Sequence, residues 1–267
     1  MDGNQFRHGK PERITRKWWF FLIFVLLQFV TPPYASKGYT WDQWGDVIRH
    51  SVGNAFIYSY SELYPIFKIV PVVLIALIIV FRNRFRRLFN LYVALSYILF
   101  AFGQNIAVTE KYGLSICTIN LIMFPAVAGF WIWEAIVLQN DFSPAKIPFW
   151  RYWVVPLAFL AFWYPLNNQT CMPDFNPAYL FTNGAGIAFC TMTPVYVGLL
   201  TIYYPRVNIA TLRITGLIGL MIGIYNMITN FFVNPGRLWW NGVLHIPLLI
   251  VSLYGLVLSF RKQSQIT

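Results

Sequence analysis

The chain has 267 residues, of which 58% are hydrophobic, 19% aromatic and only 11% charged. An average soluble domain carries about 25% charged residues, so this composition excludes a globular protein with a water-facing surface. The formal net charge of +11 is typical of membrane proteins whose short cytoplasmic loops collect Lys and Arg, and we expect no nucleic-acid partner. The composition predicts an all-α protein, a polytopic transmembrane helical bundle that fills 1–267 as a single domain.

A basic leader at 1–17 precedes eight apolar stretches, which predict about eight membrane spans. Most of them approach the roughly 20 residues that cross the hydrocarbon of a bilayer, although the fifth is short. The stretches cover residues 18–34, 62–81, 88–107, 114–138, 152–167, 179–203, 213–233 and 242–260.

The first stretch also fits a secretory signal peptide, because a basic leader precedes an apolar run there. The only cleavage site that fits follows Ala35, and it places Pro33 where a small residue is expected. We therefore expect the first span to be uncleaved. Cleavage would leave seven spans and an N-terminus outside.

Segment 35–61, between the first two spans, carries apolar residues at helical spacing. This spacing predicts an amphipathic helix that lies at the outer membrane interface. The same helix would also fit a lid over the mouth of the bundle. The stripe consists of Trp41, Trp44, Val47, Ile48, Val52, Phe56 and Ile57.

The basic residues between the spans predict the orientation of the chain. Fifteen of the twenty fall on one side, and cytoplasmic loops are enriched in Lys and Arg. We therefore expect both the N- and the C-terminus in the cytoplasm and a multi-pass protein of the plasma (inner) membrane. The fifteen are Arg7, Lys10, Arg13, Arg16, Lys17, Arg82, Arg84, Arg86, Arg87, Lys146, Arg151, Arg206, Arg213, Arg261 and Lys262.

Every span that runs from outside to inside contains a proline at similar depth. Proline removes one backbone hydrogen bond and collides with the carbonyl four residues earlier, so these spans are predicted to be proline-kinked helices. Irregular backbone at membrane depth is tolerated where it is buried in protein or lines a wet cavity. The prolines are Pro71, Pro125, Pro194 and Pro247.

Polar residues within the spans concentrate in the half that we assign to the outside. Close helix packing with amide hydrogen bonds explains any single one of them, but packing alone gives no reason to prefer one leaflet. An outward-facing polar pocket does give one. The candidate ligand-binding residues are Lys68, Gln104, Asn105, Asn120, Asn183, Asn226, Asn230 and His245.

His245 is the only intramembrane histidine, which makes it a candidate titratable group. An enzyme that acts on a lipid in the outer leaflet would use it as a base, with Thr191 or Cys190 as the nucleophile. The sequence has no motif for a nucleotide, a catalytic zinc or an acyl-transfer serine, and we expect no cofactor and no metal site. Whether the chain is an enzyme stays open.

The stretch Cys171-Met172-Pro173-Asp174, followed by Cys190-Thr191 and Pro194, resembles a family of uncharacterised polytopic bacterial membrane proteins, a domain of unknown function. The resemblance implies a similar order of hairpins over about two-thirds of the chain. That family has no established chemistry, so the resemblance implies no function.

The pattern favours an integral membrane protein whose outward-facing polar pocket binds or transports a small solute or a lipid headgroup. Lys68 would attract an anionic group, the amides would donate and accept hydrogen bonds, and His245 would titrate. Two alternatives stay open, the intramembrane enzyme and a non-catalytic subunit of a membrane complex. The expected partners are the lipid bilayer, the solute or lipid, and a membrane-protein partner or a second copy of the chain.

Overall fold

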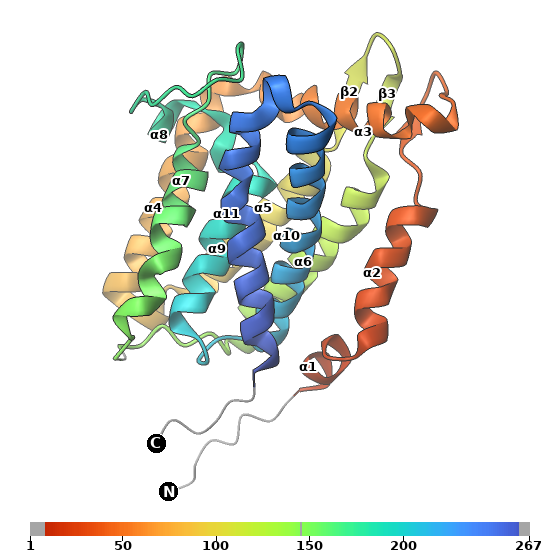
Figure 1. The fold of residues 1–267 in the computed structure, drawn as a ribbon. Helices are drawn as coiled ribbons and strands as arrows, with labels where there is room; N and C mark the ends of the chain where they lie inside the picture. Colours follow the sequence, from red (N-terminus) through yellow and green to blue (C-terminus); the bar gives the residue numbers. More distant parts are fainter. Residues whose placement is uncertain (1–8, 145, 262–267) are drawn as a thin grey trace, which may run out of the picture.

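A computed structural model of the chain describes residues 9–144 and 146–261. In this part of the chain eleven α-helices form a helical bundle (Figure 1), which confirms the all-α prediction. The first eight residues of the predicted leader 1–17 lie outside the described residues, and the rest of the leader contains the short helix α1.

The helices follow the apolar stretches of the sequence in order. They are α1 (Lys10–Thr15), α2 (Trp18–Val30), α3 (Trp44–Gly53), α4 (Tyr64–Phe81), α5 (Arg86–Gly103), α6 (Thr118–Val137), α7 (Val154–Trp163), α8 (Tyr179–Thr182), α9 (Phe189–Tyr203), α10 (Ile209–Ile228) and α11 (Pro235–Phe260). Short 3₁₀ segments connect them, namely η1 (Trp41–Gln43), η2 (Phe56–Ser59), η3 (Ser61–Leu63), η4 (Arg82–Arg84), η5 (Phe149–Trp153) and η6 (Gly184–Ile187). A π-helical turn, η7 (Thr229–Val233), extends α10.

The sequence analysis missed a small antiparallel sheet at one end of the bundle. It consists of β1 (Tyr34–Ala35), β3 (Gly113–Ile116) and β2 (Ile106–Thr109), in that spatial order. The predicted spans 88–107 and 114–138 included parts of β2 and β3, because a short β-branched run is as apolar as a helix end. Gly113 has φ +65°, and a Cβ there would lie 2.2 Å from the Ser36 hydroxyl, so the hairpin turn requires glycine.

Helix α3 covers this sheet, and so the helix expected within segment 35–61 is found at Trp44–Gly53. Val47 is buried, whereas Trp41 of the predicted apolar stripe is 74% exposed. Asp46 of α3 accepts hydrogen bonds from Lys111 (2.7 Å) and Tyr112 (2.6 Å) in the turn between β2 and β3. These hydrogen bonds lower the pKa of the Asp46 carboxyl to about 2.

Aromatic side chains from α5, α6 and α9 fill the interior of the bundle. Tyr97, Trp131 and Tyr196 are fully buried. The ring of Tyr196 lies 6.1 Å from that of Tyr97 and 6.4 Å from that of Trp131, in tilted or edge-on arrangements. Such pairs contribute about 0.5–1.5 kcal/mol each beyond the burial of their surface.

The predicted prolines lie inside four helices: Pro71 in α4, Pro125 in α6, Pro194 in α9 and Pro247 in α11. Pro71 leaves the carbonyl of Phe67 without its helical partner. Gly186 of η6 packs against this carbonyl, and a Cβ at position 186 would lie 2.5 Å from its oxygen. A side chain at position 186 would therefore separate η6 from α4.

Four helical stretches of the described residues are long and apolar enough to cross a membrane: Ser61–Arg84, Thr118–Val137, Ile209–Val233 and Pro235–Phe260. A fifth is added if Tyr179–Ile187 and Phe189–Tyr203, which are bent by 93°, count as one span. Helices α2 and α7 have 13 and 10 residues, or about 20 and 15 Å, and hydrocarbon is about 30 Å thick. Eight spans and the orientation of the termini therefore stay predictions.

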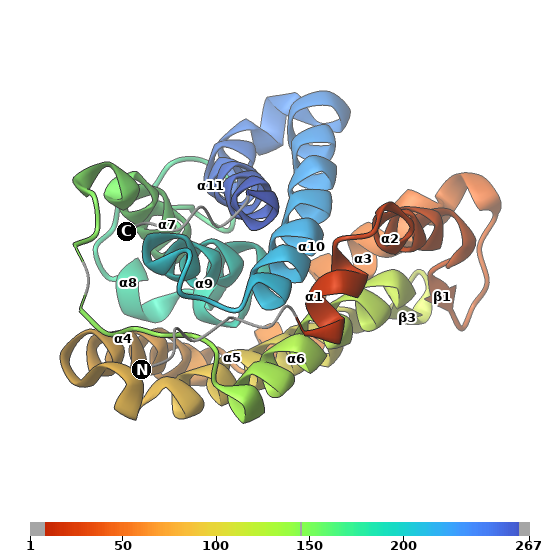
Figure 2. The ribbon, with the colours of Figure 1, turned by 90° about the horizontal axis from the view of Figure 1, so that it is seen from below.

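Helices α1 and α2 lie at the side of the bundle, as the view along its axis shows (Figure 2). Arg213 of α10, which is only 1% exposed, donates to Thr15 of α1 at 2.8 Å and to the carbonyl of Ser259 in α11 at 2.5 Å. Helix α2 contacts α6 through the rings of Phe20 and Phe130. We call the end of the bundle with the sheet the sheet end, and the opposite end, where α1 begins and α11 ends, the terminal end (Figure 1).

Candidate functional site

The predicted polar residues lie toward the sheet end, where several helices begin or end inside the bundle. The last four carbonyls and the first four N–H groups of a helix have no partner within it. Where such an end is buried, side chains must satisfy these groups. Four of the eight predicted ligand-binding residues do this, namely Lys68, Gln104, Asn105 and Asn183.

The C-terminal end of α7 is satisfied by three side chains from three other elements. Lys68 of α4 donates to the carbonyl of Phe162, and its ammonium lies 4.4 Å from the centre of that residue's ring. Asn183 donates to the carbonyls of Trp163 (2.8 Å) and Tyr164 (3.0 Å). The indole of Trp240 in α11 donates to the carbonyl of Pro165 at 2.7 Å. Lys68 and Asn183 are thus capping residues of a short helix.

The N-terminal end of α9 is satisfied mainly by Gln104. Its side-chain oxygen accepts from the backbone N–H of Phe189 at 2.7 Å, and its side-chain nitrogen donates to the hydroxyl of Tyr58, also at 2.7 Å. The hydroxyl of Thr191 donates to the carbonyl of Ala185, across the bend between η6 and α9. These contacts hold the bent segment in place.

Asn105 and Asn120 form a pair that joins the end of α5 to the start of α6. The Asn120 amide donates to the side-chain oxygen of Asn105 at 2.6 Å. The Asn105 amide in turn donates to the carbonyls of Phe100 (2.8 Å) and Ala101 (3.2 Å), near the end of α5. Both residues therefore stabilise the connection between α5 and α6, which carries the sheet.

The remaining predicted ligand-binding residues, Asn226, Asn230 and His245, join other side chains in a chain of contacts between α7, α9, α10 and α11, which we call the His245 site. It consists of Tyr164, Cys190, Asn226, Asn230, Asn241 and His245. The hydroxyl of Tyr164 donates to the Asn241 side chain, whose amide donates to Asn230 at 2.7 Å. Asn230 donates to the backbone of Asn226 at 2.7 Å, and Asn226 donates to the sulfur of Cys190 at 3.6 Å.

His245 closes this site with one ring nitrogen engaged. Its Nδ1 lies 2.7 Å from the backbone carbonyl oxygen of Asn241, one helical turn earlier. A carbonyl only accepts hydrogen bonds, so Nδ1 carries a proton, and Nε2 is an acceptor whenever the ring is neutral. Within the described part of the chain Nε2 has no hydrogen-bond partner, although the residue is only 6% exposed. The ring of Tyr164 lies edge-on to the imidazole, at 6.0 Å.

The three candidate catalytic residues are not hydrogen-bonded to one another in the described residues. Thr191 donates to a carbonyl across the bend, and the Cys190 sulfur accepts from Asn226. Neither the hydroxyl nor the thiol is hydrogen-bonded to the imidazole of His245. Among the described residues no group of three or more His, Cys, Asp or Glu side chains could hold a metal ion.

Sequence reasoning missed Tyr58 and Tyr164 as members of the polar network. Tyr164 follows α7 with φ +53°, and its hydroxyl bonds to Asn241 of α11. Its position at the end of the shortest predicted span was the one available signal, since a span too short to cross must end among other helices. Tyr58 lies in η2, where the sequence predicted only the continuation of the amphipathic segment.

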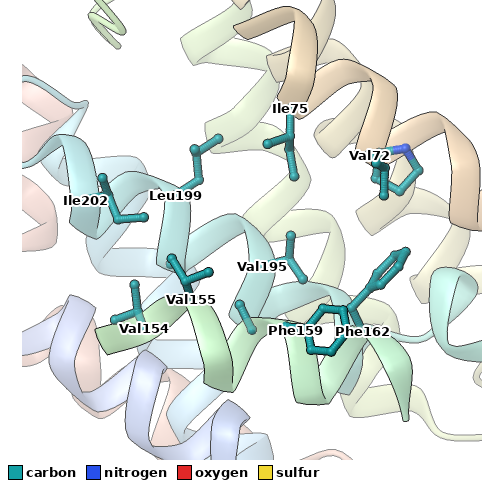
Figure 3. A pocket seen from close by; sticks show the side chains of 12 residues that line it. Val72, Ile75, Val154, Val155, Phe159, Phe162, Val195, Leu199 and Ile202 are labelled. Carbon is teal, nitrogen blue, oxygen red and sulfur yellow. The ribbon is translucent and has the colours of Figure 1, made fainter. Parts of the chain in front are cut away.

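An apolar groove of about 200 Å³ lies beside the polar network, between α4, α7 and α9 (Figure 3). Its twelve lining residues are Pro71, Val72, Ile75, Val154, Val155, Ala158, Phe159, Phe162, Val195, Gly198, Leu199 and Ile202. No candidate site residue lines it. Phe162 connects the two regions, because its ring lines the groove and also faces the Lys68 ammonium.

A second polar network lies near the terminal end, around Glu134 of α6. The fully buried carboxylate accepts from the backbone N–H of Asn140 (2.7 Å) and from the Asn208 side chain (2.7 Å). Asn208 also caps α10, since its side-chain oxygen accepts from Ala210 and Thr211. This network holds two connecting segments against the bundle.

No protein family model, curated protein or solved structure matches this chain. The family resemblance inferred from Cys171–Asp174 is therefore not supported by a family model. No fold or activity is transferred from a relative.

Proposed function

We propose that this chain is a multi-pass membrane protein that binds a hydroxyl-bearing solute or lipid headgroup at the His245 site. The membrane location is supported by four helices of sufficient length and by the large apolar side chains exposed around the bundle. Soluble monomers rarely expose apolar patches larger than a few hundred Å². Ile79 and Val80 of α4 and Phe159 of α7 are half or more exposed.

In this proposal α2, α5, α7 and the bent pair complete the eight spans, and both termini lie in the cytoplasm of a plasma (inner) membrane protein. The sheet end then faces outward, and the His245 site lies in the outer half of the bilayer. This orientation is supported by the excess of Lys and Arg at the terminal end.

The single observation that carries the ligand class is the unpartnered Nε2 of His245. In the neutral ring this atom accepts a hydrogen bond, and it is not one of the buried polar atoms, so a ligand that donates a hydrogen bond can reach it. A hydroxyl group does so without bringing a net charge to a nearly buried position. The neighbouring Asn241 amide donates to the Asn230 side chain and the Asn230 amide to the Asn226 backbone, so neither of them donates to Nε2 in place of the ligand.

The test compares two anionic lipids, of which only one carries headgroup hydroxyls. Phosphatidylglycerol and phosphatidylmethanol are added to the purified chain in mild detergent, and bound lipid is counted by native mass spectrometry. We expect the wild type to retain phosphatidylglycerol preferentially and His245→Phe to lose this preference. A parallel titration with free glycerol identifies a solute site, since glycerol would then raise the Tm of the wild type and not of His245→Phe.

The matched control is His50→Phe. His50 lies on α3 with its Nδ1 2.9 Å from the carbonyl of Asp46, the same one-turn contact as His245 makes, but at the protein surface. His50→Phe should leave the preference for phosphatidylglycerol unchanged. The proposal is wrong if the wild type discriminates neither the lipids nor glycerol, or if both His variants behave alike.

A further inference from the structure

The apolar groove between α4, α7 and α9 is a feature of the bundle that the His245 site does not use. Every one of its lining residues is apolar or glycine (Figure 3). Its volume of about 200 Å³ exceeds the roughly 150 Å³ of an apolar cavity that binds benzene. The groove therefore accommodates a segment of one hydrocarbon chain.

Two of the residues that line the groove are small and lie on neighbouring helices. Gly198 of α9 and Ala158 of α7 both line it, and a Cβ at position 198 would meet its nearest atoms at 3.8 Å. This is an ordinary contact distance, so helix packing does not require glycine at position 198.

Arg151 lies at the end of the groove nearest the terminal end of the bundle. It belongs to η5, one turn before Val154 and Val155, which line the groove. Its Nη1 donates to the carbonyl of Tyr204 and lies 3.5 Å from that of Ile202, another lining residue.

The partly exposed Arg151 guanidinium, whose Cζ lies 5.6 Å from the centre of the Trp150 ring, keeps donors free for a ligand. In the described residues its Nε and Nη2 have no hydrogen-bond partner and no carboxylate pairs with it. Arginine presents donors in a planar fork that matches a phosphate. The flanking Phe149 and Trp150 are 89% and 56% exposed, as is common for aromatic residues at a membrane interface.

We infer that this groove holds one acyl chain of an anionic phospholipid whose phosphate is bound by Arg151. The inference rests on the proposed membrane location, but not on the His245 site. The chain would run from the interface at Arg151 along Ile202, Val155 and Gly198 toward Phe162. In the proposed orientation this lipid belongs to the cytoplasmic leaflet, where anionic lipids are concentrated.

The charge at one end favours a lipid over a helix of a partner protein. A partner helix about 10 Å in diameter would need a wider apolar face. It would also give no reason for an arginine at the end of the groove. An acyl chain fits a narrow apolar channel, and the phosphate of the same molecule complements the arginine.

The test uses phosphatidylmethanol, an anionic lipid without a headgroup hydroxyl, so that the His245 site does not contribute. Native mass spectrometry of the full chain in mild detergent should show one retained phosphatidylmethanol, bound at least tenfold more tightly than phosphatidylcholine. Arg151→Gln should weaken the anionic lipid at least tenfold. Arg84→Gln, an exposed arginine of η4 at the same end, should leave binding unchanged.

Filling the groove tests the acyl chain separately. Gly198→Leu should remove the retained lipid, whereas Gly198→Ala should keep it, because its Cβ makes only ordinary contacts. Ala158→Phe fills the groove from α7 if Gly198→Leu fails to give a monodisperse protein. Retention of lipid in a folded groove-filling variant overturns the inference, as does an equal loss in Arg151→Gln and Arg84→Gln. Loss of phosphatidylmethanol in His245→Phe would place the lipid at the other site and also overturns it.

Discussion

The side-chain amide nitrogen of Asn183 lies 2.8 Å from the carbonyl oxygen of Trp163, the last residue of α7, and 3.0 Å from that of Tyr164. One residue of the bent segment therefore closes a helix that ends inside the bundle. The side-chain oxygen of Asn183 also accepts from Ala185, at the start of η6. The end of α7 and the start of η6 thus depend on the same side chain.

Asn183→Ala should destabilise the protein by about 2 kcal/mol. It leaves the Trp163 carbonyl unpaired, whereas the Tyr164 carbonyl still accepts from the Leu166 N–H at 2.8 Å. An unsatisfied buried group costs about 1–3 kcal/mol. Asn183→Asp should be destabilising as well, since a carboxylate keeps the cap on η6 but cannot donate to α7. Asn54→Ala is the control, because Asn54 donates to the His50 carbonyl at the end of α3 in an exposed position. Thermal unfolding in detergent measures all three, and an equal effect of Asn54→Ala would contradict the role of burial.

The class of fold could be predicted from the sequence because apolar stretches separated by basic loops leave few alternatives. Internal prolines were placed correctly for the same reason, since a proline in a long apolar run still lies within a helix. The small sheet could not be predicted: β2 and β3 continue the apolar character of α5 and α6, and only their pairing across Gly113 distinguishes them from helix ends.

The polar residues illustrate a second limit. Sequence depth alone placed Lys68, Gln104 and Asn183 in one half of the spans, and that clustering is real. These three residues cluster because they satisfy helix ends that lie inside the bundle. Where a helix ends depends on tertiary packing. The sequence marked 152–167 as the shortest span, but no pattern in it predicted that the helix there would have only 10 residues. The His245 site is what remains after the capping residues are assigned.

Gly186→Ala should destabilise the protein by about 1–3 kcal/mol, the usual cost of overpacking. A Cβ at position 186 would lie 2.5 Å from the Phe67 carbonyl oxygen and 3.0 Å from the Lys68 nitrogen. Both are backbone atoms, so no side-chain rotation relieves the contact. Gly129→Ala in α6 is the control, because nothing lies within 4 Å of its Cβ. Replacing glycine by alanine at an open helical position stabilises by about 0.5–1 kcal/mol, so the two variants should shift Tm in opposite directions.

Asp46→Asn should lower stability at pH 7 by about 1 kcal/mol, in the range of partly exposed ion pairs. Hydrogen bonds from Lys111 and Tyr112 lower the Asp46 pKa to about 2, below its ordinary value of 3.8. A carboxyl with a lowered folded-state pKa stabilises above the unfolded pKa and loses this contribution as pH falls through the folded pKa.

The difference in Tm between wild type and Asp46→Asn should therefore be constant above about pH 5 and vanish between pH 4 and pH 2. Asp42→Asn, an exposed position with no ion pair in the described residues, should show no such dependence. A difference that grew on acidification would show that the carboxyl is not stabilised as the anion.

Glu134→Gln should destabilise the protein by about 1–3 kcal/mol although it preserves size. Both carboxylate oxygens of Glu134 accept hydrogen bonds, one from the Asn140 N–H and one from the Asn208 side chain. A glutamine places an NH₂ group against one of these donors, and the resulting donor–donor contact leaves buried groups unpaired.

The double variant Glu134→Gln with Asn208→Asp should recover most of this loss. Aspartate at position 208 accepts from the new glutamine amide, and it is also a favourable N-cap for α10. Asn208→Asp alone should be destabilising, because two buried carboxylates would then face each other. Thermal unfolding of the three variants completes a double-mutant cycle with a favourable coupling energy. Additive losses in the cycle would mean that the hydrogen bond between these residues does not hold the start of α10 to α6.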